Sequence, residues 1–324
     1  MRPKRSFRST SMLLLLVPSL ALGAEEDLQK FSIDSTITYE YRRPRGVPFI
    51  TNLFADFGLV YSNTVDRKQL PWMLGIAGAT LVSLHYDEEI LRGAQWFGKS
   101  VGIGDGSTRT FFMGGFSADV PTDVGSSLYF LGNGWLHVST ALAFLGAGYL
   151  GNDYRAWSTS YALFEGLLAV GIATQFLKHL TGRESPFLRT EPRGAWRWFP
   201  DPVDYFHHVP KYDAFPSGHL ATAMLTVTVI SENYPEYGFI KPVGYSLMAL
   251  LAFQMLNNGV HWLSDYPLAL AIGNVFAKSA VSHYRKVTQS IAGFDEERRH
   301  EPAMFFFTPL LADRSAGVAA TLLF

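Results

Sequence analysis

The sequence predicts an all-α protein, a helical bundle with several membrane-spanning helices and a short C-terminal β-hairpin. Five apolar stretches of helical length support the bundle: residues 126–150, 157–180, 220–230, 243–256 and 262–281. Gly, Ser and Thr interrupt all five, which suits close helix packing in a membrane or a compact bundle. Two further apolar pieces, 304–311 and 317–324, flank Asp313-Arg314-Ser315 and predict the hairpin.

The N-terminus has the organisation of a secretory signal peptide over residues 1–24. Arg2, Lys4, Arg5 and Arg8 form a basic region, and an apolar run follows at residues 12–22. That run is too short for a bilayer-spanning helix of about 20 residues, and small residues follow it. An uncleaved anchor is the alternative, and either interpretation predicts export or membrane insertion.

Residues 25–125 are expected to form an N-terminal extension. The alternation within 31–41 weakly indicates a strand, and one short apolar helix is expected at 71–84, before the polar residues that begin at His85. The Gly- and Ser-rich segment 98–125 predicts a loop. The helical domain is then placed at 126–283 and a polar tail, with the possible hairpin, at 284–324.

Composition restricts the partners and compartments. Lys and Arg total 27 against 28 Asp and Glu, for a net charge of −1, so no basic stripe for nucleic acid is expected. The absence of Cys excludes disulfides and thiolate metal sites. No protein partner can be inferred, and a hydrophobic fraction of 48% is compatible with several membrane spans or with a compact bundle.

His261 and Asp265 form the first of three candidate motifs. Four residues apart, they share a face if the helix begins at or before His261. An aspartate that accepts one imidazole N–H fixes the tautomer and aims the other nitrogen outward, as a nucleophile or general base requires. Alone, such a pair is also typical of a structural contact.

The second motif is Phe-Pro-Ser-Gly-His at 215–219, and the third begins at Lys178. Proline, serine and glycine favour a helix start whose exposed N–H groups bind phosphate, where His219 could act as a general acid. Lys178 could reach an interface with its ammonium, or hold a phosphate as a point charge. In an up-down bundle Lys178, His219 and His261 all fall at the same end.

Together the three segments resemble the type 2 phosphatidic acid phosphatase and vanadium haloperoxidase superfamily, of the exported bacterial, lipid phosphatase-like kind. Its pattern is Lys-x6-Arg-Pro, then Pro-Ser-Gly-His, then Ser-Arg-x5-His-x3-Asp, and the resemblance covers roughly residues 125–283 in order and spacing. It implies an all-helical bundle in which the last histidine forms a phosphohistidine without a metal or cofactor. The implied roles are nucleophile for His261, orienting partner for Asp265, general acid for His219, and phosphoryl binding for Lys178, Ser217 and Gly218.

Two positions depart from that pattern. Ser185 and Met255 stand where it has arginines, so two bidentate phosphate-binding groups are replaced. Arg183 is the predicted substitute. On a continuous helix it would point about 140° away from Lys178, so this role requires the helix to end at Gly182.

These features predict a phosphatase that acts on a lipid phosphate or diphosphate in the inner membrane, with its site on the exported, periplasmic side. Loop 184–215, rich in aromatic residues, suits the headgroup level of a bilayer. The alternatives are a catalytically impaired family member with a binding role, and a soluble periplasmic acid phosphatase or peroxidase. Vanadate would be a cofactor only for the peroxidase.

Overall fold

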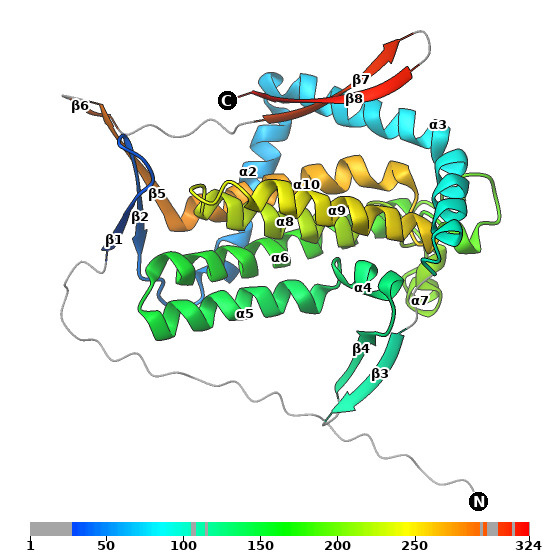
Figure 1. Ribbon diagram of the computed structural model, residues 1–324, viewed down its shortest axis with the longest axis horizontal. Helices are drawn as coiled ribbons and strands as arrows, with labels where there is room; N and C mark the ends of the chain where they lie inside the picture. Colours follow the sequence, from blue (N-terminus) through cyan, green and yellow to red (C-terminus); the bar gives the residue numbers. More distant parts are fainter. Residues whose placement is uncertain are drawn as a thin grey trace, which may run out of the picture.

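The structure is a computed structural model that describes residues 28–104, 108–113, 116–291, 294–296, 304–312 and 315–323. The predicted signal peptide lies outside these residues. Five helices run side by side as the central bundle (Figure 1). They are α5 (Gly134–Gly151), α6 (Tyr154–Thr181), α8 (Gly218–Asn233), α9 (Ile240–Asn257) and α10 (Tyr266–Tyr284). The predicted helical bundle is therefore confirmed.

Small residues bring α6, α8 and α10 close together, as the interrupted apolar stretches indicate. A Cβ on Gly166 would lie 2.4 Å from Leu225, and one on Gly273 would lie 2.3 Å from the carbonyl oxygen of Ala221. Leu163, Leu225 and Phe276 fill the core between these helices. Burial of each such side chain contributes about 1.5–3 kcal/mol.

Local sequence determines where the bundle helices begin and end. Asp153 caps the start of α6 by accepting the backbone N–H of Ala156, and Gly182 ends the helix with a left-handed φ of 52°. The predicted stretch 126–150 is divided, because α4 (Val124–Phe130) ends before α5 begins at Gly134. Asn133 caps α5 by accepting the N–H of Trp135.

The N-terminal extension holds more helix than expected. α1 (Pro48–Thr51) and α2 (Leu53–Val65) precede the 3-10 turn η1 (Arg67–Gln69) and α3 (Leu70–Ser100). The 31 residues of α3 replace the short apolar helix expected at 71–84. The polar residues after His85 do not end it, because Asp87 is fully buried and bonded within the structure.

Strands account for two further differences. The expected loop 98–125 contains a hairpin of β3 (Thr108–Met113) and β4 (Phe116–Pro121). A turn divides the weak strand pattern at 31–41 into β1 (Leu28–Ser32) and β2 (Ile37–Arg42). Composition alone did not predict these strand pairings.

A four-stranded sheet pairs strands that precede the helical bundle with strands that follow it. Its order is β1-β2-β5-β6, with β5 (Arg285–Ile291) and β6 (Phe294–Glu296) taken from the predicted polar tail. Near the C-terminus β7 (Met304–Ala312) pairs antiparallel with β8 (Ser315–Leu323), at the place of the expected hairpin. Figure 1 shows the four-stranded sheet at one end of the bundle and α4 and α7 (Pro202–His207) at the other.

The expectation of several membrane-spanning helices finds limited support. Among the described residues, α6 alone is long and apolar enough to cross a bilayer, and 44% of its apolar window is buried in the protein. The other bundle helices have 16 to 19 residues, near or below the usual spanning length of about 20.

Candidate active site

Lys178, His219 and His261 meet at one end of the bundle, as the alternating helix directions predict. Lys178 lies in the last turn of α6, His219 in the first turn of α8, and His261 shortly before α10. The ring centroids of the two histidines are 6.0 Å apart. The ammonium of Lys178 lies 3.6 Å from the position that a Cβ on Gly218 would occupy. Three segments far apart in sequence thus surround one small volume.

The contacts of His261 determine its tautomer. Its Nδ1 lies 2.8 Å from the carbonyl oxygen of Ala214 and 3.2 Å from Oδ2 of Asp265. A carbonyl and a carboxylate both accept hydrogen bonds, so Nδ1 must carry the proton. In the neutral ring, Nε2 therefore holds the free lone pair. The side chain is only 2% exposed, so water has little access to it.

Asp265 orients His261 through a turn rather than along a helix. The 3-10 turn η4 (Leu263–Asp265) precedes α10, and Oδ2 of Asp265 also accepts the backbone N–H of Trp262 at 2.8 Å. The predicted contact therefore exists, although no α-helix includes His261. The shorter contact with the carbonyl oxygen of Ala214 could not be predicted from the sequence, because every residue has a backbone carbonyl.

Arg183 contacts Asp265 on the opposite carboxylate oxygen from His261. Its guanidinium donates to Asp265 at 2.5 Å, to Asp87 at 2.7 Å and to Ser264 at 2.7 Å, and it is fully buried. Gly182 does end α6 and turn the chain inward, as the prediction required. The guanidinium donates instead to two carboxylates and to the Ser264 hydroxyl, while its Nε–H has no hydrogen-bond partner. These contacts favour a role of Arg183 beside Asp265, and its predicted phosphate-binding role stays a prediction.

Asp87 extends this network into the N-terminal extension. Its Oδ1 accepts the backbone N–H of Ser264 at 2.9 Å, and its Oδ2 accepts the Ser264 hydroxyl at 2.5 Å. One fully buried arginine is thus matched by two fully buried carboxylates, from α3 and η4. Sequence analysis assigned Asp87 to the polar end of a helix. Because Glu88 and Glu89 follow it, the sequence alone does not distinguish the buried Asp87 from exposed acidic residues.

The amino terminus of α8 and Lys178 provide the setting for an anion. Ser217 is the N-cap, and its carbonyl oxygen accepts the N–H of Ala221, so the backbone N–H groups of Gly218 and His219 have no intrahelical acceptor. Lys178 also pairs with Asp213 at 2.9 Å, and Asp213 accepts the hydroxyl of Tyr205 at 2.6 Å. An incoming anion therefore competes with Asp213 for the ammonium.

His219 is held in a mostly apolar setting. Its ring packs against Tyr129 of α4, with centroids 4.9 Å apart, and a Cβ on Gly132 would lie 2.7 Å from its own Cβ. Burial, together with the neighbouring His261 and Lys178, lowers the pKa of His219 to about 3. With this pKa, His219 is neutral at ordinary pH. A bound phosphate would raise its pKa by favouring the charged form.

Comparison with known proteins identifies the family. Residues 159–289 match the family model described as the PAP2 superfamily. This part of the chain belongs to that superfamily. Members of the PAP2 superfamily are generally phosphoester hydrolases, which supports a phosphatase-type function. No curated protein and no solved structure matches the chain.

The matched PAP2 region carries Lys178, His219, His261 and Asp265, but not Asp87. The two departures from the PAP2 pattern are accommodated differently. Met255 is fully buried, with its sulfur 3.6 Å from the Ser217 hydroxyl, so an apolar side chain lies under the N-cap. Ser185 is buried in a loop, where its backbone N–H donates to Pro210.

The remaining arginines of loop 184–215 do not replace the two that are absent. Arg189 lies 3.6 Å from Glu88, and Arg197 lies 3.4 Å from Glu184. Arg193 donates to the carbonyl oxygen of His85 at 3.4 Å. All three interact with acceptors away from the two histidines, which leaves Lys178 as the cation nearest to the start of α8 among these groups.

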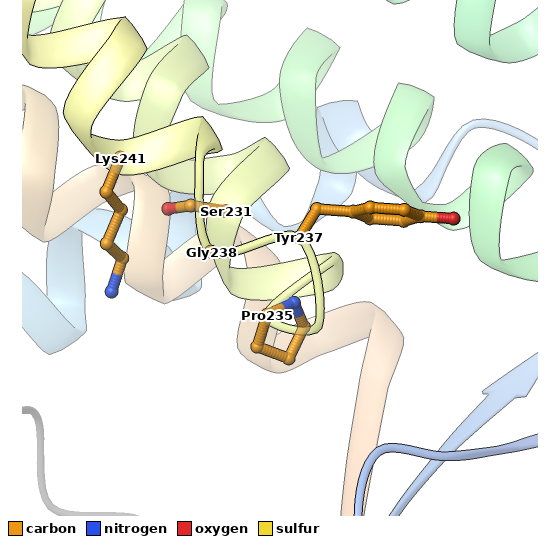
Figure 2. A pocket seen from close by; sticks show the side chains of 5 residues that line it. All are labelled: Ser231, Pro235, Tyr237, Gly238 and Lys241. Atoms are coloured by element: carbon orange, nitrogen blue, oxygen red, sulfur yellow. The ribbon is translucent and has the colours of Figure 1, made fainter.

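A surface cavity of about 100 Å³ lies at the far end of α8 (Figure 2). Its lining residues are Ser231, Pro235, Tyr237, Gly238 and Lys241. Twelve residues of helix separate Ser231 from His219, or about 18 Å at 1.5 Å per residue. The cavity is therefore remote from the histidine site, and its Ser231 hydroxyl donates to the carbonyl oxygen of Thr228 at 3.1 Å.

Proposed function

We propose that the protein hydrolyses a lipid phosphate or diphosphate through a phosphohistidine formed on His261. The tautomer of His261 carries this proposal. Its Nδ1–H faces two acceptors, Ala214 and Asp265, so the lone pair lies on Nε2. A buried, oriented imidazole of this kind is a competent nucleophile toward phosphorus.

In the proposed reaction, Nε2 of His261 attacks phosphorus and the bond from phosphorus to the leaving oxygen breaks. His219, which takes up a proton when the phosphate dianion binds beside it, gives that proton to the leaving oxygen. A water molecule then attacks the phosphohistidine and the N–P bond breaks. His219 takes a proton from the water, phosphate leaves, and both histidines return to their initial state. These residues use no metal ion in any step.

The phosphoryl oxygens are assigned to Lys178 and the N–H groups at the start of α8, with Ser217 holding that start in place. Oriented backbone N–H groups and a point charge stabilise the charge that develops on the transferring group. Asp213 provides a matched counter-charge while the site is empty. The phosphate then displaces that carboxylate from the ammonium.

Exposed aromatic side chains near the site support a lipid substrate and a membrane location. In loop 184–215, Phe199 and Phe206 are 74% and 79% exposed, and Trp198 is 60% exposed. Aromatic residues of this kind are favoured at the headgroup level of a bilayer. Together with the predicted signal peptide, they favour the inner membrane with the site on the exported side.

A binding role with impaired catalysis is the second candidate, and Met255 and Ser185 are the observations that favour it.

Phosphate release from phosphatidate, an isoprenyl diphosphate and a soluble phosphate monoester tests the proposal. We expect the wild type to hydrolyse a lipid substrate in detergent micelles, and His261→Ala to lose activity by about 10⁴-fold or more. His207→Ala, at an exposed histidine of α7, is the matched control and should retain activity. If the wild type and His261→Ala are equally inactive on all three substrates, the hydrolysis proposal is contradicted and the binding role is favoured.

A further inference from the structure

A second buried polar cluster lies far from the candidate active site. Asp56 of α2, Glu165 of α6 and His283 of α10 place one ligand-type atom each within 4.8 Å of one another. Glu165 and Lys178 are thirteen residues apart on α6, which separates the cluster from the site by about 20 Å. Figure 1 shows α2 running across the bundle helices there. The cluster therefore joins the N-terminal extension to the bundle.

The three side chains are held in place by their neighbours. Nδ1 of His283 lies 2.6 Å from Glu165 and 3.7 Å from Asp56. Tyr284 and Asn52 donate to the other oxygen of Glu165 at 2.6 and 2.8 Å. Ser279 donates to Oδ1 of Asp56 at 2.5 Å. These outer hydrogen bonds orient the carboxylates, as they do around bound metal ions.

One atom in the cluster has no partner. Oδ2 of Asp56 is buried without a hydrogen bond, and the Asp56 side chain is fully buried. A buried, unpaired carboxylate oxygen is costly unless a proton or cation reaches it. Glu165 is also fully buried, and the single imidazolium that His283 can form balances one of the two negative charges. The cluster thus lacks one positive charge.

We propose that Asp56, Glu165 and His283 bind a divalent transition-metal cation such as Zn²⁺. One imidazole nitrogen and two carboxylate oxygens are ligands that this ion accepts, at about 2.0–2.2 Å. Ligand atoms around such an ion are about 3–4 Å apart, so the present separations need only small adjustments. The cation supplies the missing charge and connects α2 to α6 and α10. Its role is structural and independent of the proposed reaction.

Zinc binding by the tag-free, chelator-treated full chain tests this site. We expect isothermal titration calorimetry to give one Zn²⁺ per chain, and thermal unfolding to shift upward with added Zn²⁺. Asp56→Asn keeps the shape and the Ser279 hydrogen bond, and His283→Gln changes a partly exposed side chain. Each should raise the Kd for Zn²⁺ at least tenfold and reduce the thermal shift. Co²⁺ should give an absorption spectrum typical of nitrogen and oxygen ligands, which both variants lose.

His207→Gln is the matched control, because it removes an exposed histidine elsewhere and should leave zinc binding unchanged. Equal zinc affinity in the wild type and both variants would overturn the proposal, as would the absence of a thermal shift at saturating Zn²⁺. If Asp56→Asn instead stabilises the zinc-free chain and zinc does not bind, the two carboxyl groups share a proton. Circular dichroism confirms folding, and phosphatase activity does not enter the comparison.

Discussion

His261 and its partners form one half of the candidate active site, and the start of α8 with Lys178 forms the other. In the first half the buried guanidinium of Arg183 connects Asp265 to Asp87, so that neither carboxylate is without an ion-pair partner. In the second half, Met255 lies under the N-cap and Lys178 is shared with Asp213. The imidazole of His261 is thus firmly oriented, while few groups are placed to hold an anion. From this difference we expect a weakly bound substrate and a slow chemical step.

The difference also argues against a second role for Arg183 in the anion-binding half. A guanidinium buried between two carboxylates is favourable only while both pairs are intact, because burial removes its hydration. Turning Arg183 toward a phosphate would leave Asp87 and Asp265 buried without a counter-charge. The arginine therefore belongs to the nucleophile half.

Among the variants that test this comparison, His219→Gln is expected to cause the largest loss of rate, on substrates whose leaving group needs a proton. If His219 protonates the leaving oxygen, hydrolysis of an alkyl or lipid phosphate should slow by about 10²–10⁴-fold. Hydrolysis of p-nitrophenyl phosphate should change much less, because its leaving group needs no proton. Steady-state rates on both substrates measure this, and equal losses on both would exclude the general-acid role.

Asp87→Asn should disturb the nucleophile half from outside the matched PAP2 region. Loss of one carboxylate leaves Arg183 with a single counter-charge, so we expect stability to fall by about 1–3 kcal/mol. The kcat should fall by about tenfold with little change in KM, because the orientation of His261 depends on this network. Glu88→Gln removes a partly exposed neighbouring charge and should cost less than about 1 kcal/mol. A change in KM alone would contradict this positioning role.

Met255→Arg tests the anion half in the opposite direction. A guanidinium near Ser217 should tighten binding of inorganic phosphate by about tenfold, since bidentate contacts to phosphate are strong. Competitive inhibition by phosphate measures the change, with Met255→Leu as the control for packing. Unchanged phosphate affinity in a folded Met255→Arg protein would show that this half is not limited by the missing charge.

A smaller effect is expected on pH-dependent stability. The unfolded chain binds a proton on His219 below a pKa of about 6.5, while burial keeps the folded side chain neutral down to about pH 3. The free energy of unfolding should therefore decrease as pH falls through this window, by up to about 1.4 kcal/mol per pH unit. Denaturant unfolding should show a shallower decrease for His219→Gln. Identical slopes for the two proteins would contradict the lowered pKa.

The sequence predicted the bundle and the meeting of its three motifs because both depend on local patterns. Apolar length defined the helices, and alternating directions placed Lys178, His219 and His261 at one end. The Gly182 turn was also predictable, since the left-handed region favours glycine. Each of these inferences needs only residues that are close together in the chain.

Partners from distant segments could not be predicted. Asp87 is 96 residues from Arg183, and nothing near Asp87 indicates that its carboxylate is buried. The pairing of β2 with β5 and the contact of Ala214 with His261 also join residues that are far apart in the sequence. Such contacts depend on how helices and loops pack after they form.

Direct detection of the phosphorylated histidine tests the central claim, that Nε2 of His261 attacks phosphorus. The wild type would be mixed with its hydrolysed substrate, quenched in base during turnover, digested and examined by mass spectrometry. The proposal predicts a phosphoryl group on His261 that is stable in base, is lost in acid, and is absent from His261→Ala. A phosphoryl group on any other residue, or none during measurable turnover, would contradict it.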